Sequence, residues 1–341
     1  MRLEPPPWWY RERVTWVARA LRPAGFVYGL AGRARWAIAR LYRSRLPVIC
    51  IGNLTAGGAG KTPLAIEVAR LLGKRGARPA FLSRGFRGTL RGPHLVDPQR
   101  DKAVEVGDEP LLLARHAPTV VARDRTAGAR LIETLPVDAI VMDDGLQNPH
   151  LAKDLTLAAL DPARMIGNGL VMPAGPLRLP LPFQLARTDA LVMVSGSGEQ
   201  EASFPEPLRA LTLLRAKIMP AGETACLAGE RVVAFAGIGR PGKLFDTLRS
   251  LGAVVPDAIS FEDHHRYGEA DALRLLERAR MLGGRLVTTE KDWVRIGEGE
   301  SLARLKAVAW GLPVEARFTG DGIGDLLERV MRVRARSEVV A

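Results

Sequence analysis

A glycine-rich stretch that ends in lysine and threonine is the part of the sequence whose residue types point most directly to chemistry. It comprises Thr55, Ala56, Gly57, Gly58, Ala59, Gly60, Lys61 and Thr62. Glycines let backbone N–H groups converge on phosphate oxygens, a lysine ammonium can reach β- and γ-phosphates, and a threonine hydroxyl can ligate Mg²⁺. The stretch therefore predicts a phosphate-binding loop (P-loop) for ATP and Mg²⁺, in which Lys61 also serves catalysis. The strict pattern has glycine where Thr55 stands.

The segments on either side of this loop are those that a phosphate site requires. Residues 46–51 form a short, β-branched apolar run that ends at Gly52, as expected of a buried parallel strand. Pro63 then opens a stretch with a helical apolar stripe, and proline is favoured in the first turn of a helix. A glycine turn that binds no nucleotide is the alternative. The order strand, loop, helix disfavours it, because the N-terminus of a helix attracts phosphate.

A second apolar run, residues 137–142, ends in the carboxylates Asp143 and Asp144. Carboxylates at the C-terminal end of a strand beside a phosphate loop can hold Mg²⁺ directly or through water. A lone aspartate would more often cap the next loop, whereas a doublet favours metal binding or catalysis. We therefore predict that Thr62, Asp143 and Asp144 hold the metal, and that Asp144 is also a candidate catalytic group.

The positive charge of the chain is concentrated at its N-terminus. Of the net charge of +12, residues 1–46 contribute +8 from ten Arg and two Glu, and they also hold four of the six Trp and three of the four Tyr. Aromatic rings prefer the boundary between water and lipid, and guanidinium groups meet anionic headgroups. We therefore predict that residues 1–45 form two short helices, divided at Pro23-Ala24-Gly25, on an anionic membrane surface. An arm packed on its own domain and a nucleic-acid-binding arm are the alternatives.

The remaining composition suits the cytoplasmic side of a membrane. No stretch reaches the roughly 18 consecutive apolar residues that a spanning helix needs, and no signal-peptide pattern is present. Only two cysteines, Cys50 and Cys226, are present, and each lies within an apolar run, which suits a reducing compartment.

Apolar runs that alternate with helical stretches predict an α/β fold with a mostly parallel sheet covered by helices on both faces. The first set of predicted strands lies at 48–51, 80–82, 118–121, 137–142, 155–160 and 189–194, and the second set at 227–237, 254–261, 285–289 and 305–309. We therefore expect four parts: the N-terminal helices at 1–45, a P-loop domain at 46–222, a smaller α/β domain at 223–330 and a frayed basic tail at 331–341. The proposed boundary is Met219-Pro220-Ala221-Gly222, a turn-forming sequence.

Several segments, taken in order, resemble the tetraacyldisaccharide 4'-kinase family. They cover about residues 46–295, and their joint occurrence is far more specific than any single one. They are Gly52 to Pro63, Leu82-Ser83-Arg84-Gly85-Phe86, Val106-Gly107-Asp108-Glu109-Pro110, Asp143-Asp144-Gly145-Leu146-Gln147, Gly167-Asn168-Gly169, Pro173 to Arg178, Phe235 to Gly239, Asp263-His264-His265 and Thr288 to Asp292. In this family a small hydroxyl residue commonly stands at the position of Thr55.

The resemblance implies a P-loop kinase that transfers the γ-phosphate of ATP to the 4'-hydroxyl of a tetraacyldisaccharide 1-phosphate, giving lipid IVA in lipid A biosynthesis. It also implies a peripheral location on the cytoplasmic face of the inner membrane. The expected partners are the acylated glucosamine disaccharide and the anionic membrane surface, with no nucleic acid and no obligate protein partner. Another P-loop NTPase or small-molecule kinase is the alternative. Residues 289–292 lack the spacing of a guanine-reading element, which favours ATP over GTP.

Further site residues follow from matching the family's segments. A sugar hydroxyl is a poor nucleophile and needs a carboxylate to accept its proton. Asp108, in a glycine-preceded segment that we expect to be a flexible loop, is the candidate base. His264 is expected to orient it and to stabilise its charge, and metal binding by the Asp-His-His run is the alternative.

Arginines are the expected partners of the substrate's 1-phosphate or of ATP, since guanidinium groups match phosphate oxygens. The candidates are Arg84, Arg123 and Arg125. One departure from the family stands nearby: the family usually has glutamate where this chain has Leu179. The resemblance therefore does not carry over to this chain any metal or nucleotide role of that glutamate.

Overall fold

The structure is a computed structural model that describes residues 5–11, 13–196 and 204–339. Its larger part is a nine-stranded sheet in the order β13-β8-β7-β6-β1-β5-β2-β4-β3. The strands are β1 (Val48–Asn53), β2 (Pro79–Ser83), β3 (His94–Leu95), β4 (Thr119–Val121), β5 (Ala139–Asp143), β6 (Leu155–Leu160), β7 (Ala190–Gly196), β8 (Thr212–Pro220) and β13 (Val314–Thr319). All neighbours pair in parallel except β3 with β4 and β13 with β8, at the two edges.

Strand β1 lies in the middle of this sheet and is buried on both faces. Ile49 and Ile51 point to a core shared with α2 (Lys61–Gly73) and α11 (Gly322–Val339). Val48 and Cys50 point to the opposite face, covered by α5 (Arg125–Ile132). Successive side chains of a strand alternate between faces, so a continuous apolar run fits a sheet covered on both sides. The predicted α/β fold with a mostly parallel sheet is confirmed.

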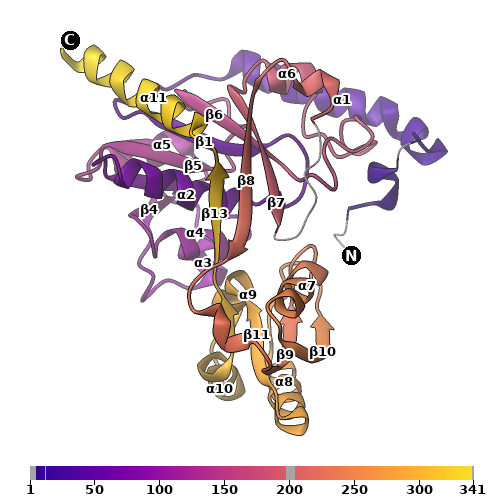
Figure 1. The fold of residues 1–341 in the computed structure, drawn as a ribbon. Helices are drawn as coiled ribbons and strands as arrows, with labels where there is room; N and C mark the ends of the chain where they lie inside the picture. Colours follow the sequence, from indigo (N-terminus) through magenta and orange to yellow (C-terminus); the bar gives the residue numbers. More distant parts are fainter. Residues whose placement is uncertain (1–4, 12, 197–203, 340–341) are drawn as a thin grey trace.

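A second, four-stranded parallel sheet forms a smaller unit, which Figure 1 shows below the large sheet. Its order is β10-β9-β11-β12. The strands are β9 (Arg231–Ala236), β10 (Val254–Ser260), β11 (Arg285–Thr289) and β12 (Trp310–Leu312), and the helices are α7 (Gly242–Ser250), α8 (Glu269–Leu282), α9 (Glu290–Arg295) and α10 (Glu300–Val308). The strand expected at 305–309 is wrong: these residues lie mostly in α10, whose Leu302 and Leu305 pack in the core of the unit.

The C-terminal segment returns from the small unit to the large one. Strand β13 pairs antiparallel with β8, so that Val314 faces Pro220, and α11 then packs against the core beneath β1. The smaller unit is therefore shorter than the domain expected at 223–330. The expected frayed tail is helical up to Val339, and residues 340–341 lie outside the described residues.

Short helices connect the strands of the large unit on the side that faces the small one. These helices are α3 (Ala103–Val106) and α4 (Asp108–Leu113). A further short helix of the large unit, α6 (Leu181–Leu185), precedes β7 and lies away from the small unit in Figure 1. Val106 and Leu111 share an apolar cluster with Val294 of α9, and this cluster joins the two units. Single 3₁₀ turns lie at η1 (Pro7–Tyr10), η2 (Glu206–Leu208) and η3 (Thr224–Leu227).

The N-terminal helix α1 (Trp16–Ile38) runs through Pro23, so the expected division at Pro23-Ala24-Gly25 is wrong. Tertiary packing outweighs the break, because Gly25 and Gly29 are buried against the segment at 171–180. A Cβ on Gly25 would lie 2.7 Å from the carbonyl oxygen of Val171. Among the described residues, none of the helices combines the length and apolar character needed to cross a membrane. Residues 1–4 and 12 of the predicted interface segment lie outside the described residues.

Candidate active site

The P-loop connects the C-terminal end of β1 to the first turn of α2, and its glycines make the tight return possible. Gly60 caps α2 with a φ of +74°, a backbone conformation that favours glycine. Lys61 lies 3.3 Å from the side-chain oxygen of Asn53 and 3.5 Å from Oδ1 of Asp144. Burial lowers the pKa of Lys61, while Asp144 acts against that shift. The ammonium is thus held at the mouth of the loop, where the phosphates of a nucleotide would lie.

Asp143, at the end of β5, lies next to Thr62 of the loop. The two oxygens, Oδ2 of Asp143 and Oγ1 of Thr62, are 3.5 Å apart, because β5 pairs directly with β1. Burial and the charge of Asp144 raise the pKa of Asp143 to about 6. Its Oδ1 is buried without a hydrogen-bond partner. A buried carboxylate oxygen with no partner, on the same carboxylate that the Thr62 hydroxyl approaches, fits a divalent cation.

Asp144 is more open and has two cationic partners. Arg178 bonds to both of its carboxylate oxygens, with the shortest distance 3.0 Å, and Lys61 lies on its other side. Burial by itself would raise the pKa of Asp144, but these two cations outweigh it and lower the pKa to about 2. Its backbone has a φ of +51°, unusual for a non-glycine residue. Such backbone conformations are concentrated at functional sites.

Asp108 is not in a flexible loop, which corrects the expectation from the sequence. It is the first residue of α4, and its side chain is buried beneath the small unit. Burial acts to raise its pKa, but His264 and the guanidinium of Arg295 lower the pKa well below its usual range. The physical reason for the correction is that α9 packs across α4 and covers the carboxylate.

His264 follows β10 and approaches Asp108 from the small unit. Its Nδ1 lies 3.6 Å from Oδ2 of Asp108, and its ring meets Phe86 edge-on at 5.6 Å between centroids. His264 also has a positive φ, +60°. The structure therefore brings together two predicted residues that are 156 positions apart, one from each unit.

Lys291 lies between Asp108 of the carboxylate–histidine pair and Asp143 at the end of β5. Its Nζ lies 2.9 Å from Oε1 of Glu109. Burial alone would lower the pKa of Lys291, but nearby carboxylates outweigh it and raise the pKa. These carboxylates are Glu109, Asp108 and Asp143. A single lysine of α9 is thus close to both halves of the site.

The three predicted arginines lie in different environments. Arg125 is buried, where burial and the positive charge of Arg84 lower its pKa to about 10. Arg84 and Arg123 are exposed. Arg123 and Arg125 line a cavity of about 610 Å³ between α5 and the end of α1. Five arginines and one carboxylate, Asp124, are among its lining residues, so the cavity is strongly positive.

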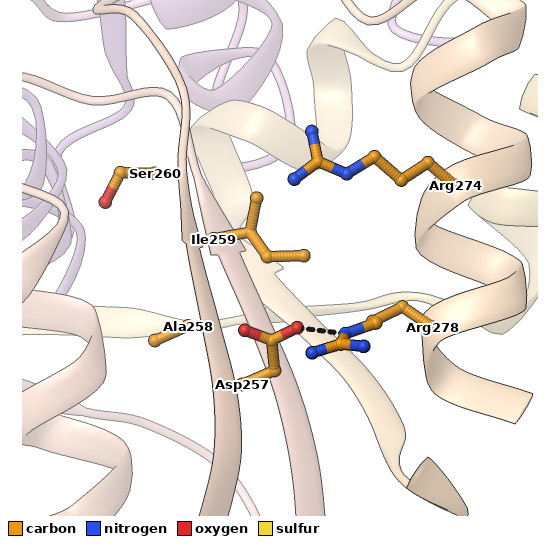
Figure 2. Close-up of a pocket in the computed structure, with 6 residues that line it drawn as sticks. All are labelled: Asp257, Ala258, Ile259, Ser260, Arg274 and Arg278. Atoms are coloured by element: carbon orange, nitrogen blue, oxygen red, sulfur yellow. Dashed lines mark hydrogen bonds and ion pairs between the residues drawn. The ribbon is translucent and has the colours of Figure 1, made fainter. Parts of the chain in front are cut away.

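A second cavity, shown in Figure 2, lies between β10 and α8 of the small unit. Arg274 and Arg278 line it, and Arg278 is already paired with Asp257 at 2.5 Å. None of its lining residues belongs to the groups described above.

Sequence reasoning missed Arg295 as a member of the site. The sequence did offer one indication. Arg295 follows Lys291 by four residues in α9, so the two side chains lie on the same face of that helix. Sequence reasoning also gave no role to Arg178 or Asn53, although both lie in segments that carry the family resemblance. Leu179, where the family usually has glutamate, is buried and packs against Gly32 of α1.

A strand-end carboxylate pair beside a P-loop, together with an aspartate–histidine pair contributed by the two units, is the arrangement of a P-loop phosphotransferase. Residues 17–332 match the family model for tetraacyldisaccharide-1-P 4'-kinase. The chain therefore belongs to the tetraacyldisaccharide 4'-kinase family, as the sequence motifs predicted.

Individual relatives agree with this assignment over nearly the whole chain. A tetraacyldisaccharide 4'-kinase of Methylorubrum extorquens (strain PA1) is 48% identical over 99% of this chain and 98% of its own. That of Rhodopseudomonas palustris (strain HaA2) is 44% identical over 97% and 98%. A crystal structure of LpxK from Aquifex aeolicus in complex with ATP superposes with a TM-score of 0.73 at 25% identity, covering 92% of this chain and 99% of that one.

Proposed function

We infer that the chain is an ATP-dependent kinase that transfers the γ-phosphate of ATP to the 4'-hydroxyl of a tetraacyldisaccharide 1-phosphate, giving lipid IVA. Family membership over residues 17–332 supports the activity. One structural observation carries the chemistry: Lys61 of the P-loop lies beside the strand-end carboxylates, and Lys291 of the small unit lies near enough to both Asp108 and Asp143 for their charges to raise its pKa. Such an arrangement can hold a triphosphate on one side and receive an acceptor hydroxyl on the other.

Asp108 is the proposed base for the acceptor hydroxyl. It is buried, ionised and next to His264, so it can accept a proton as the bond to phosphorus forms. The imidazole can take up part of the positive charge that this proton brings, and so stabilise the protonated state of the pair. Lys61 contributes differently: it is the first residue of α2, where its ammonium would meet the phosphates of ATP and offset their negative charge.

Mg²⁺ is the proposed metal, and the protein offers it Thr62, Asp143 and Asp144. The unpartnered buried oxygen of Asp143 fits this role. Within the described residues, no group of three or more His, Cys, Asp or Glu side chains could hold a metal by itself. Mg²⁺ is usually held by one or two carboxylates together with substrate phosphates, so this donor set suits the ion that accompanies ATP. When bound, the ion offsets the charge of the transferred phosphoryl group.

The cavity between α5 and α1 is the proposed site for the anionic 1-phosphate of the acceptor. Arg123 from the large unit and Arg35 and Arg40 from the N-terminal segment converge on it. Guanidinium groups bind phosphate oxygens through two parallel N–H bonds, which gives both charge and orientation. Arg84 and the buried Arg125 extend the positive field toward Asp143 and Asp144.

Helix α1 is the proposed contact with the cytoplasmic face of the inner membrane. Large apolar side chains on its outer face are exposed, including Trp16 at 79%, Phe26 at 73% and Ile38 at 82%. Arg19, Arg22 and Arg33 lie among them and are exposed as well. A helix with exposed aromatic and arginine residues suits the headgroup layer, where an acylated substrate would also lie.

The test is a label-transfer assay in detergent with γ-labelled ATP and the disaccharide 1-phosphate. We expect label in the lipid with the wild-type protein and almost none with Asp108→Asn, which keeps the size of the side chain but cannot accept the proton. GTP in place of ATP should support much less transfer. Release of free phosphate without labelled lipid would instead favour another P-loop NTPase.

A further inference from the structure

A single buried guanidinium lies between the two members of the acid–base pair. Arg295 is the last residue of α9, and only 7% of its side chain is exposed. Its Nε and Nη2 both donate to Oδ2 of Asp108, the first at 2.8 Å. Nη2 also lies 3.1 Å from Nδ1 of His264. One side of the guanidinium therefore contacts both members of the pair.

The other side of the same guanidinium is anchored in the small unit. Nη1 donates to the carbonyl oxygen of Gly237 at 2.8 Å and to Oδ1 of Asp292 at 3.0 Å. Asp292 is fully buried and accepts two further bonds, from the backbone N–H of Gly237 and the hydroxyl of Thr289. Arg295 is thus fixed by the ends of β9 and β11 before it reaches Asp108.

These contacts determine which ring nitrogen of a neutral His264 carries the proton. A guanidinium has N–H donors and no acceptor, so Nδ1 of His264 must accept from Arg295 through its lone pair. The proton of the neutral ring then belongs to Nε2, which lies 3.9 Å from Oδ1 of Asp263. Nδ1 is 3.6 Å from Asp108, too far for a direct hydrogen bond.

We propose that Arg295 is a positioning residue that holds Asp108 and His264 as one unit and keeps the proton of neutral His264 on Nε2. This proposal rests on the proposed role of Asp108 as the base. If Arg295 served only to stabilise the fold, its ion pairs with Asp108 and Asp292 would be sufficient. Its additional contact with the imidazole of His264 would then have no purpose. Because the anchor lies in the small unit, the pair is assembled only when α9 packs against α4. Without Arg295, Nδ1 can take the proton and donate directly to Asp108.

The experiment combines ¹⁵N spectra of the histidine rings with steady-state kinetics on the full-length protein. Arg295→Met removes the charge at similar length. Arg295→Lys keeps a charge but cannot make the same set of contacts, because an ammonium lacks the fork of the guanidinium. Arg280→Met, an exposed position in α8, is the matched control. His264→Gln identifies the signals of His264 among the five histidines.

We expect wild type and Arg280→Met to show the Nε2–H form of His264, and both Arg295 variants to shift toward the Nδ1–H form. We also expect kcat to fall by about 10²-fold in the Arg295 variants, as for other misplaced catalytic groups, with the KM for ATP unchanged. If Arg295→Met does not fold, Arg295→Lys carries the test. An unchanged tautomer, a wild type in the Nδ1–H form, or a normal kcat would each overturn the proposal.

Failure of the base assignment gives a different result. If Asp108→Asn retains a normal kcat, then Asp108 is not the base, whatever the ring spectra show. If Asp108→Asn is inactive while the spectra of the Arg295 variants match wild type, then the base assignment stands and the positioning role is wrong.

Discussion

Two adjacent aspartates of the site have opposite electrostatic environments. Asp143 is 4% exposed and has no cationic partner at hydrogen-bond distance among the described residues, so its pKa rises to about 6. Asp144 lies between Lys61 and Arg178, and its pKa falls to about 2. At neutral pH both are ionised, but only the charge of Asp143 opposes folding. A bound cation would remove that cost, which fits the proposed metal site.

Asp143→Asn should therefore stabilise the metal-free protein while abolishing its activity. The pKa in the folded state, about 6, lies above the ordinary value of 3.8, so the ionised carboxylate destabilises the fold at neutral pH. We expect a gain on the order of 2–3 kcal/mol above pH 6. The gain should shrink as the pH falls from 6 and vanish below 3.8, because the wild-type carboxyl is then protonated in both states. Urea unfolding in EDTA measures it.

Asp144→Asn is the control for this prediction. It loses the attraction of Arg178 and Lys61, so no stabilisation is expected at neutral pH. If Asp143→Asn lowers stability at pH 7.5, the environment assigned to Asp143 is wrong.

Lys61→Ala and Asp108→Ala should both abolish transfer, for separable reasons. Lys61 is the proposed partner of the ATP phosphates, so its loss should weaken ATP binding as well as the chemical step. Asp108 is the proposed base for the acceptor hydroxyl, so its loss should lower kcat by about 10²–10⁴-fold and leave ATP affinity near that of wild type. Calorimetric titration with ATP, alongside single-turnover transfer, distinguishes the two.

The double variant Asp108→Ala/His264→Ala tests whether the pair works as one unit. It should be no slower than Asp108→Ala by itself. Additive losses would show that His264 acts independently, and a near-normal kcat for Asp108→Ala would move the base to Asp144.

The sequence predicted much of the site at the residue scale, but not its electrostatics. The P-loop and the Asp143–Asp144 pair follow from local order, because a strand end and a helix start are neighbours in the chain. Asp108 and His264 came only from the family resemblance. Arg295 could not be found as their partner, because the contact depends on how α9 packs on α4.

Helix α1 shows how tertiary packing decides the path of an element. Its small residues Gly25, Gly29 and Gly32 face the segment at 171–180, and large apolar residues face outward. The sequence indicated an interface helix from its composition. It could not indicate that Pro23 is tolerated, because the compensating contacts come from residues about 150 positions away.

Gly25→Ala should loosen α1 although alanine favours a helix. The added Cβ would meet the backbone oxygen of Val171 at 2.7 Å, so α1 must shift. We expect a loss of about 1–3 kcal/mol, as for other overpacked sites. Gly73→Ala is the matched control, since this residue ends α2 with open space around it. There we expect no loss or a small gain. A stabilised Gly25→Ala would contradict this packing.

Replacing Trp16, Phe26 and Leu30 by serine should weaken binding to anionic vesicles and leave ATP affinity unchanged. These side chains are exposed on α1 and have an apolar surface that lipid would cover. The control replaces Leu273 and Met281 of α8, which are comparably exposed but lie on the small unit. Vesicle co-sedimentation compares them. Equal binding by the α1 variant and wild type would leave α1 as a structural arm only.

The polypeptide chain passes between the two units twice, and these two passages join the units. The chain leaves the large sheet after β8, builds the small sheet, and returns through β13, which pairs with β8 (Figure 1). Lys291 with Glu109 and Lys102 with Glu298 add ion pairs across the units. This arrangement lets α9 supply groups to a site whose other half lies at the ends of β1 and β5.

At this scale the sequence predicted two α/β units but misplaced the C-terminal segment. Strand patterns are local, and residues 314–319 look the same whether they pair with β12 or β8. Their partner is decided by the non-local register in which Val314 faces Pro220. The expected boundary at residue 330 therefore divides α11, which belongs as a whole to the large unit.

The proposed activity is the phosphorylation of one specific hydroxyl of a lipid disaccharide. The most direct measurement is a two-dimensional ¹H–³¹P correlation spectrum of the lipid product formed from ATP and the disaccharide 1-phosphate. We predict that the new phosphorus signal correlates with H-4' of the distal glucosamine, and that the 1-phosphate signal stays in place. A new phosphate on any other position, or ADP formation with no new lipid signal, would show that this chain is not a 4'-kinase.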